Sequence, residues 1–128
     1  MKEWTQKELE EAGFKIENAQ ISRVDLSMAD YGVLTLEMSI VGNGWGCVYG
    51  GRVIGQGYLG ANEFKGSPMG IEYIMRIMDI VGVEKFNEMS GKYIRVAMTG
   101  WGDSIRIIGN LIKNRWFDAD RFFENTKE

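Results

Sequence analysis

The chain has 128 residues and a mass of 14.5 kDa, and we expect it to form a single domain over residues 1–128. Its hydrophobic share of 45% and charged share of 26% exclude a disordered chain, and its net charge of −3 is not that of a nucleic-acid-binding protein. Histidine is absent from the sequence, which excludes Ser-His-Asp and Cys-His catalysis and histidine-ligated zinc.

The first predicted elements are a short helix and two strands. Thr5 and Glu8 have the spacing of a capping box, which predicts a helix that begins after Thr5 and ends at Gly13. The pattern becomes extended over residues 14–26. Apolar and polar residues then alternate over residues 33–41, which is typical of a strand with one buried face.

A glycine-rich region follows. Asn43-Gly44 predicts a turn into a third strand over residues 45–54, and residues 56–59 could extend this strand or form an edge. Ten of the 17 glycines lie between Gly42 and Gly70, among aromatic residues. Glycine at this density indicates turns, bulges or close backbone approach rather than a flexible linker.

The main helix is predicted to begin at Ser67 and Pro68 and to end at Gly82. Serine is a favoured N-cap residue, proline is favoured at the first helical position, and glycine commonly terminates a helix. Apolar residues recur at helical spacing, so we expect this helix to be mostly buried. The expected face contains Ile71, Ile74, Met75, Met78 and Val81, widened by Tyr73, Ile77 and Ile80.

The rest of the chain predicts two more strands and a last helix. Residues 92–99 alternate, residues 100–103 have the composition of a hairpin turn, and residues 104–112 read as a long final strand. Both faces of this last strand are largely apolar, so we expect it to be central. Asp118 could cap a short helix that carries Phe122 and Phe123.

Strands grouped before and after one helix indicate an α+β fold. We expect a curved antiparallel sheet of about five strands, with the main helix packed on one face and short helices at the termini.

Basic side chains are concentrated near the C-terminus. Residues 92–117 carry five basic side chains against Asp103 alone, so this segment could face an anion. In a strand over residues 104–112, Arg106 and Asn110 would share a face and would need partners there. Those partners could be an internal acid, such as Glu37 or Glu72, or a bound anion, and the sequence leaves both open.

Aromatic residues in turns and glycine-rich chain could stack on a base, contact a protein partner, or close the core. The glycines match neither the dinucleotide fingerprint nor the phosphate-binding loop motif. Combined with the basic residues, they give a candidate ligand-binding set of Trp45, Tyr49, Arg52, Arg95, Trp101, Arg106 and Asn110.

No catalytic residue, metal site or cofactor is expected. Cys47 has no histidine to activate it and reads as a small buried hydrophobe, and as the single cysteine it excludes an internal disulfide and fits a reducing compartment. The carboxylates fall in no metal-binding spacing. An enzyme relying on carboxylate, lysine or tyrosine side chains is the less favoured alternative.

The sequence also predicts a cytoplasmic location without membrane insertion. No apolar run approaches the roughly 18 residues of a membrane-spanning helix. Residues 1–5 are too polar for a signal peptide.

Three stretches within residues 16–117 carry a resemblance to a known family. They are the glycine-rich residues 42–51, the helix and following strand of residues 70–96, and residues 108–117, which begin Ile-Gly-Asn and end Trp-Phe. Together they resemble a small family of accessory proteins met in phages and prophages. In that family the glycines are usually closer together, whereas here Cys47-Val48-Tyr49 separates Gly46 from Gly50.

The resemblance implies an accessory phage protein. By analogy with other small accessory phage proteins, we expect a non-catalytic protein that opposes host antiviral defence in the host cytoplasm. The favoured mode is sequestration of a small anionic, nucleotide-like ligand. The alternative is an anti-CRISPR-like inhibitor that docks on a host defence protein through its acidic N-terminal region and exposed aromatic residues. A homodimer is also open, since a sheet covered by one helix could leave a face for a second copy.

Overall fold

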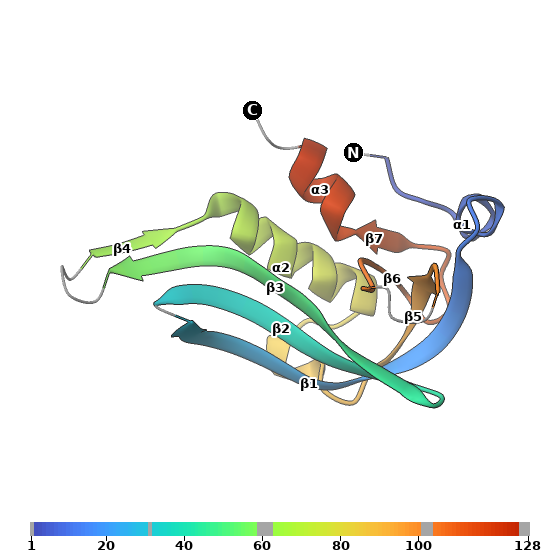
Figure 1. Cartoon of the computed structure of the whole chain (residues 1–128), viewed down its shortest axis with the longest axis horizontal. Coiled ribbons are helices and arrows are strands. Elements are labelled where there is room, and N and C mark those ends of the chain that lie inside the picture. Colours follow the sequence, from blue (N-terminus) through green and yellow to red (C-terminus); the bar gives the residue numbers. More distant parts are fainter. Residues whose placement is uncertain (1, 31, 59–62, 101–103, 126–128) are drawn as a thin grey trace.

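The computed structural model describes residues 2–30, 32–58, 63–100 and 104–125. The chain has the α+β fold expected from the sequence: an antiparallel sheet with one main helix packed on it and short helices near both ends (Figure 1). Within the described residues the sheet has seven strands, in the order β4-β3-β2-β1-β5-β6-β7, where the sequence indicated about five.

The elements follow one another as α1 (Gln6–Glu11), β1 (Lys15–Asp30), β2 (Val33–Gly42), β3 (Trp45–Tyr58), β4 (Glu63–Gly66), α2 (Pro68–Val81), a 3₁₀ turn η1 (Phe86–Glu88), β5 (Tyr93–Met98), β6 (Ile107–Gly109), β7 (Trp116–Asp118) and α3 (Ala119–Asn125). None of the helices in the described part of the chain combines the length and the apolar character that a membrane crossing requires. The caps of α1 and α2 are those predicted: Thr5 and Glu8 form the capping box, and Ser67 caps α2.

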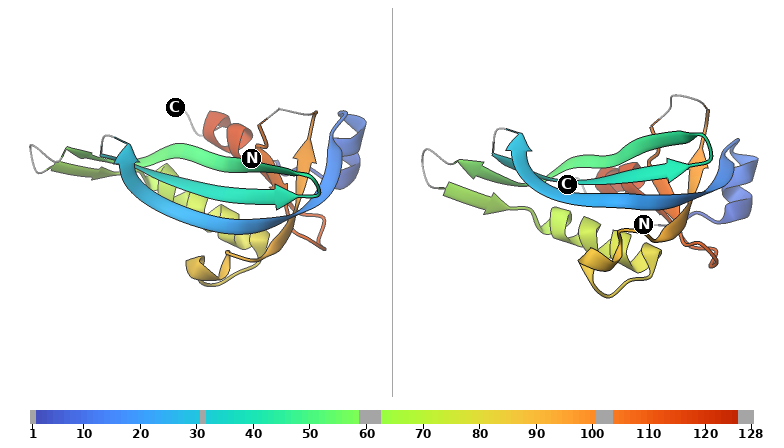
Figure 2. Two further views of the ribbon diagram at one scale, coloured as in Figure 1. Left: turned by 60° about the horizontal axis from the view of Figure 1, so that its bottom comes forward. Right: turned by 90° about the horizontal axis from the view of Figure 1, so that it is seen from below.

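Strand β1 belongs to two ladders. Its residues 15–20 pair with β5, and its residues 20–30 pair with β2, so only Gln20 takes part in both. The sheet curves along this long strand, as the two rotated views show, and α2 lies against its inner side (Figure 2).

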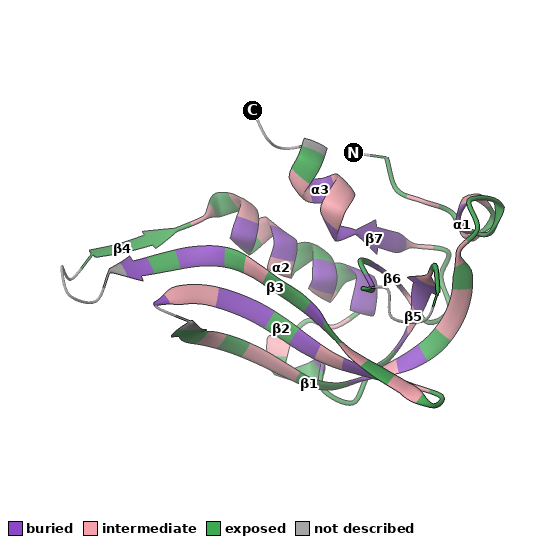
Figure 3. Cartoon of the chain, viewed as in Figure 1, coloured by how far each residue is buried: buried purple, intermediate pink, exposed green. Residues whose placement is uncertain are grey.

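The core lies between the inner face of the sheet and α2 (Figure 3). The buried side of α2 differs from the predicted face: Tyr73, Ile77 and Ile80 are buried, whereas Ile71 and Met75 are 57% and 63% exposed. The cause is tertiary, because α2 packs against β3, β6, β7 and α3, which centres its buried stripe on the Tyr73 side. The helix is therefore half-covered rather than mostly buried.

The predicted strand over residues 104–112 is wrong. Only Ile107–Gly109 forms a strand, β6, which is nevertheless central because β5 and β7 flank it. The Asn110 side chain ends it: its Oδ1 accepts the backbone N–H groups of Ile112 and Lys113, and its Nδ2 donates to the Ile80 carbonyl. Such local bonds compete with a sheet ladder and turn the chain back into β7.

Replacing Ile77 by alanine should destabilise the protein by about 2–5 kcal/mol, because Ile77 is fully buried and its loss leaves a cavity. Met75→Ala, on the exposed side of the same helix, should change the free energy of unfolding by less than about 0.5 kcal/mol. Urea unfolding followed by circular dichroism measures both. Equal losses in the two variants would show that the assignment of the buried face is wrong.

Candidate functional site

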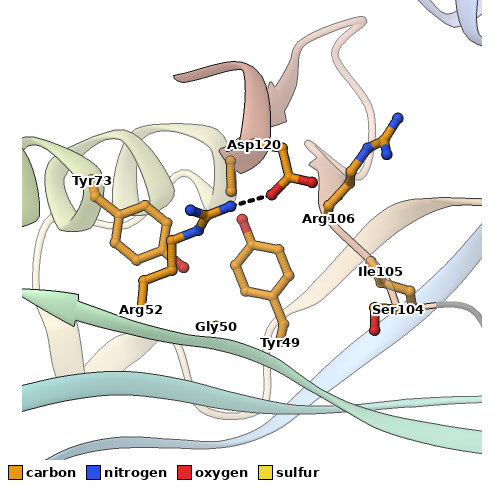
Figure 4. A pocket seen from close by; sticks show the side chains of 9 residues that line it. Tyr49, Gly50, Arg52, Tyr73, Ser104, Ile105, Arg106 and Asp120 are labelled. Atoms are coloured by element: carbon orange, nitrogen blue, oxygen red, sulfur yellow. Dashed lines mark hydrogen bonds and ion pairs between the residues drawn. The ribbon is translucent and has the colours of Figure 1, made fainter. Parts of the chain in front are cut away.

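A pocket of about 240 Å³ opens where β3, α2, α3 and the segment before β6 meet (Figure 4). Three of the seven sequence-predicted ligand residues line it: Tyr49, Arg52 and Arg106. The full lining consists of Tyr49, Gly50, Arg52, Tyr73, Ser104, Ile105, Arg106, Ala119 and Asp120.

A bulge in β3 places Tyr49 and Arg52 on the same face. Side chains alternate along a regular strand, so residues three apart would point to opposite sides. Here Tyr49 pairs with Met38 and Arg52 pairs with Leu36, and both partners are core residues of β2. The extra residue is accommodated at Gly50-Gly51, where both glycines have positive φ (112° and 79°).

Arg52 is held at the mouth of the pocket by Asp120. Its Nη2 donates to Asp120 Oδ1, and its guanidinium lies 4.4 Å from the centre of the Phe123 ring. Both side chains of the ion pair remain partly exposed. The pair is therefore screened by solvent and is open to exchange with another anion.

Two tyrosines form the buried wall. Tyr49 and Tyr73 are 2% and 0% exposed, and neither hydroxyl makes a hydrogen bond to a described residue outside this pair, although the two phenols lie close enough to interact with each other. In Figure 4 the Tyr49 hydroxyl points toward the Arg52–Asp120 pair, and the Tyr73 ring lies beside the Arg52 side chain. In a hydrogen bond between two hydroxyls only one O–H group donates, so the other is left to donate to a group that enters the pocket.

Burial also fixes the protonation state of these tyrosines. Burial raises the pKa of Tyr73 to about 12, and it raises the pKa of Tyr49 well above its usual value, with the nearby Tyr73 adding to the effect. Both phenols are therefore neutral at physiological pH and act as hydrogen-bond donors rather than as bases.

Arg106 contributes charge at the rim. Its side chain is exposed, and its guanidinium lies 5.8 Å from the centre of the Phe14 ring. In Figure 4 the guanidinium points away from the Arg52–Asp120 pair. Its backbone carbonyl accepts the N–H of Ala119, which ties the rim to the start of α3.

Arg95 and Asn110 lie outside this pocket and stabilise the turn between β6 and β7. Arg95 Nε and Nη2 donate to the carbonyls of Asn110 and Lys113, Nη1 donates to Gln6 Oε1, and the guanidinium covers the Trp116 ring at 4.7 Å. The register opposes Arg95 to Gly109, whereas Arg106 lies just before β6 and outside the paired residues.

The partners of Arg95 and Asn110 are thus mostly backbone groups rather than internal acids. Glu72, one of the acids considered from the sequence, forms an ion pair with Arg76 of its own helix, with Nε and Oε2 2.7 Å apart. Glu37, the other, is an exposed residue of β2.

The remaining candidates are spread over other parts of the chain. Trp45 donates through Nε1 to Glu17 Oε1 at 3.4 Å and lines a separate pocket of about 290 Å³ near the β2–β3 turn. Trp101 and most of the predicted turn over residues 100–103 fall outside the described residues. Cys47 is half-buried against the core, and burial raises the pKa of its thiol.

Two side chains that shape the chemistry of the pocket, Tyr73 and Asp120, are absent from the predicted set. Tyr73 reads as one more apolar position of the main helix, and Asp120 as a surface acid after the Asp118 cap, which the structure confirms by its bond to the Arg121 N–H. Only the packing of α2 and α3 against β3 brings them together. Among the described residues no three potential metal ligands of the His, Cys, Asp or Glu type cluster here or elsewhere.

Comparison with known proteins gives no relative: no protein-family model, curated protein or solved structure matches the chain. The resemblance to phage accessory proteins therefore stays a prediction.

Replacing Arg95 by lysine should lower the free energy of unfolding by about 1.5–3 kcal/mol, because an ammonium cannot reproduce the fork that joins the two carbonyls and Gln6. Arg23→Lys, at an exposed position of β1, is the matched control and should change stability by less than about 0.5 kcal/mol. Denaturant unfolding of both variants measures the difference. An unchanged Arg95→Lys stability would contradict the structural role of Arg95.

The buried tyrosines also predict a pH dependence. Their pKa is raised in the folded protein, so the unfolded chain releases these protons first, and stability falls as pH rises from about 10 toward 12. The Tyr49→Phe/Tyr73→Phe variant should lose less stability over that interval, with lysine titration common to both proteins. The same slope in the variant and the wild type would show that these phenols are not buried.

Proposed function

We propose that this chain is a non-catalytic binding protein that captures a small anionic, nucleotide-like ligand in the pocket of Tyr49, Arg52 and Tyr73. One observation carries the proposal: two buried hydroxyls with no hydrogen-bond partner outside their own pair lie beside a partly exposed guanidinium. Side chains of this kind are donors, and donors that converge in one concave site fit an acceptor-rich ligand.

The chemistry of the donors favours an oxyanion. A guanidinium binds a phosphate or carboxylate through two parallel N–H groups, and bonds to a charged acceptor are about twice as strong as neutral ones. The phenol O–H groups could donate further hydrogen bonds to the same oxyanion, and the buried surroundings would strengthen these bonds. Arg106 at the rim adds a second positive charge without competing for the site.

The size of the pocket sets which part of the ligand it holds. Pockets that enclose a drug-sized molecule measure about 300–1,000 Å³, and this one is about 240 Å³. We therefore assign the pocket to the phosphate or other anionic group of the ligand, with the remainder of a nucleotide lying outside along the rim near Ser104 and Arg106.

Asp120 plays the part of an internal competitor. Its carboxylate occupies the position on Arg52 that an incoming anion would take. Binding then exchanges one anion for another, and affinity depends on the difference between the two contacts. This arrangement keeps Arg52 neutralised in the free protein and gives the proposal a variant that should improve binding.

The absence of catalysis is proposed on the same residues. Tyrosines with raised pKa values are poor bases at neutral pH, and the described wall of the pocket offers no cysteine or lysine as a nucleophile. Counter-defence in the host cytoplasm by sequestering a nucleotide signal is the context that the resemblance to phage accessory proteins suggests.

The alternative is an anti-CRISPR-like inhibitor that docks on a host defence protein. Exposed aromatic side chains favour it: Phe64 on β4 and Tyr93 on β5 are both largely accessible. Incubation of the protein with a host extract separates the cases. An unaltered nucleotide released on denaturation supports sequestration, an altered one indicates an enzyme, and a captured host protein with no nucleotide supports the inhibitor.

Calorimetric titration with a nucleoside monophosphate tests the pocket directly, with the uncharged nucleoside as the control ligand. Arg52→Gln should weaken binding about ten- to a hundredfold, because one charge-assisted contact is worth about 1.5–3 kcal/mol. Asp120→Asn should tighten binding, because it frees Arg52. Arg23→Gln, which removes an exposed arginine on β1, should leave affinity unchanged.

Normal affinity in a folded Arg52→Gln protein would contradict the assignment of the ligand to this pocket. So would weaker binding by Asp120→Asn, because that result would make Asp120 a ligand contact rather than a competitor.

A further inference from the structure

The long strand β1 has an open edge over more than half its length. On the β5 side, pairing ends at Ile21, whose N–H donates to the Lys92 carbonyl and whose carbonyl accepts the Gly91 N–H. Residues 22–30 pair only with β2 among the described residues. Figure 1 shows this part of β1 at the border of the sheet. Open strand edges are templates for pairing with another chain.

The side chains along this edge are unusually apolar on the inner face. Val24 and Leu26 oppose the core residues Met38 and Leu36 of β2, so they point to the same side as the core. Leu26 is 52% exposed and Met28 is 39% exposed, although Leu36 and Met38 on the adjoining strand β2 are fully buried. The apolar residues on the inner face of β1 are therefore left partly exposed to solvent at the edge of the sheet.

We propose that a second copy of this chain adds to the edge, with the two β1 strands antiparallel about a two-fold axis at Leu26. Leu26 is the middle residue of the open stretch 22–30 and lies within its regular part, residues 23–27, between the two irregularities of the β1–β2 ladder. The sequence around it, Val24-Asp25-Leu26-Ser27-Met28, has the same apolar and polar order in both directions. A two-fold interface requires such self-complementarity.

The register matches side chains as well as backbone. Leu26 opposes its own copy and Val24 opposes Met28, which places apolar pairs on the inner face. On the outer face Asp25 opposes Ser27, so like charges do not face each other directly, and Asp25 already forms an ion pair with Arg23 at 2.9 Å. A register centred closer to Ile21 would drive the second strand into residues 91–93, which cover the edge there.

Other edges of the sheet fit a second copy less well. Strand β3 is unpaired by β4 over residues 45–54, but the bulge at Gly50-Gly51 interrupts it in the middle, whereas the two irregularities of β1, between Ile21 and Arg23 and between Ser27 and Asp30, lie toward the ends of its open stretch. The proposed pocket lies between β3, α2 and α3, two strands away from the β1 edge. The proposed dimer and the proposed ligand binding can therefore be tested independently of each other.

Sedimentation equilibrium over a range of protein concentrations tests the dimer. The wild type should associate reversibly to a dimer, and Leu26→Lys should weaken that dimer at least about tenfold, because it sets two like charges opposite each other. Val41→Lys is the matched control: Val41 is 41% exposed on β2, which is paired on both sides, so its dimer should equal the wild type. Circular dichroism checks that both variants fold.

Cysteine cross-linking in a Cys47→Ala background tests the register. Leu26→Cys should oxidise to a covalent dimer. Met28→Cys alone should not, but a mixture of Val24→Cys and Met28→Cys proteins should form the mixed dimer.

Three results would overturn the proposal. The first is a wild-type protein that stays monomeric at every concentration, even if its β1 edge binds an extended peptide instead. The second is a dimer that the Leu26→Lys substitution does not weaken. The third is a disulfide-linked dimer formed by Val48→Cys on β3 and not by Leu26→Cys.

Discussion

The structure depends on the length of β1. A strand of 16 residues pairs with β5 at one end and with β2 at the other, and this joins two small antiparallel units into one curved sheet. If β1 were half as long, the β2–β3–β4 and β5–β6–β7 units would share no ladder. The curvature wraps the sheet around α2 and forms one main core, while β1 beyond Ile21 is left with an open edge. The length of β1 therefore explains both how the core forms and why an edge is left open for the proposed dimer.

The pocket is a local departure from regular sheet geometry. The two glycines of the β3 bulge turn Arg52 to the side of Tyr49, and α2 and α3 supply Tyr73 and Asp120 around it. Two buried hydroxyls that can bond only to each other make the free protein less stable than a phenylalanine pair would at the same positions. Sites that lower stability in this way are commonly functional, because a ligand can supply the missing bonds.

Much of the fold could be predicted from the sequence because its signals are local. Capping residues fix α1 and α2, alternation fixes β2 and β5, and Asn43-Gly44 fixes the β2–β3 turn. The division of residues 104–112 could not be predicted from alternation, because Asn110 ends the strand through local bonds to the next residues together with a bond to Ile80 that only folding brings near. The buried side of α2 could not be predicted either, because it is set by packing against β3, β6, β7 and α3.

The candidate site was predictable in part. Tyr49, Arg52 and Arg106 were identified by residue type, but their meeting depends on a bulge and on the placement of α3. Arg95 and Asn110 show the limit of that approach: basic and amide side chains that look available in the sequence are engaged with backbone carbonyls in the structure. Residue type predicts the chemistry of a side chain, whereas its partners are set by tertiary contacts.

The central claim is that the tyrosine and arginine pocket binds an oxyanion. Nuclear magnetic resonance during a titration with inorganic phosphate tests it most directly, by following the tyrosine ring and arginine side-chain signals of the wild type. We predict saturable shifts at Tyr49, Tyr73 and Arg52, with the Arg95 signals unchanged. Shifts at Arg95 without shifts at Arg52, or no saturable shift at any of the three, would contradict the account.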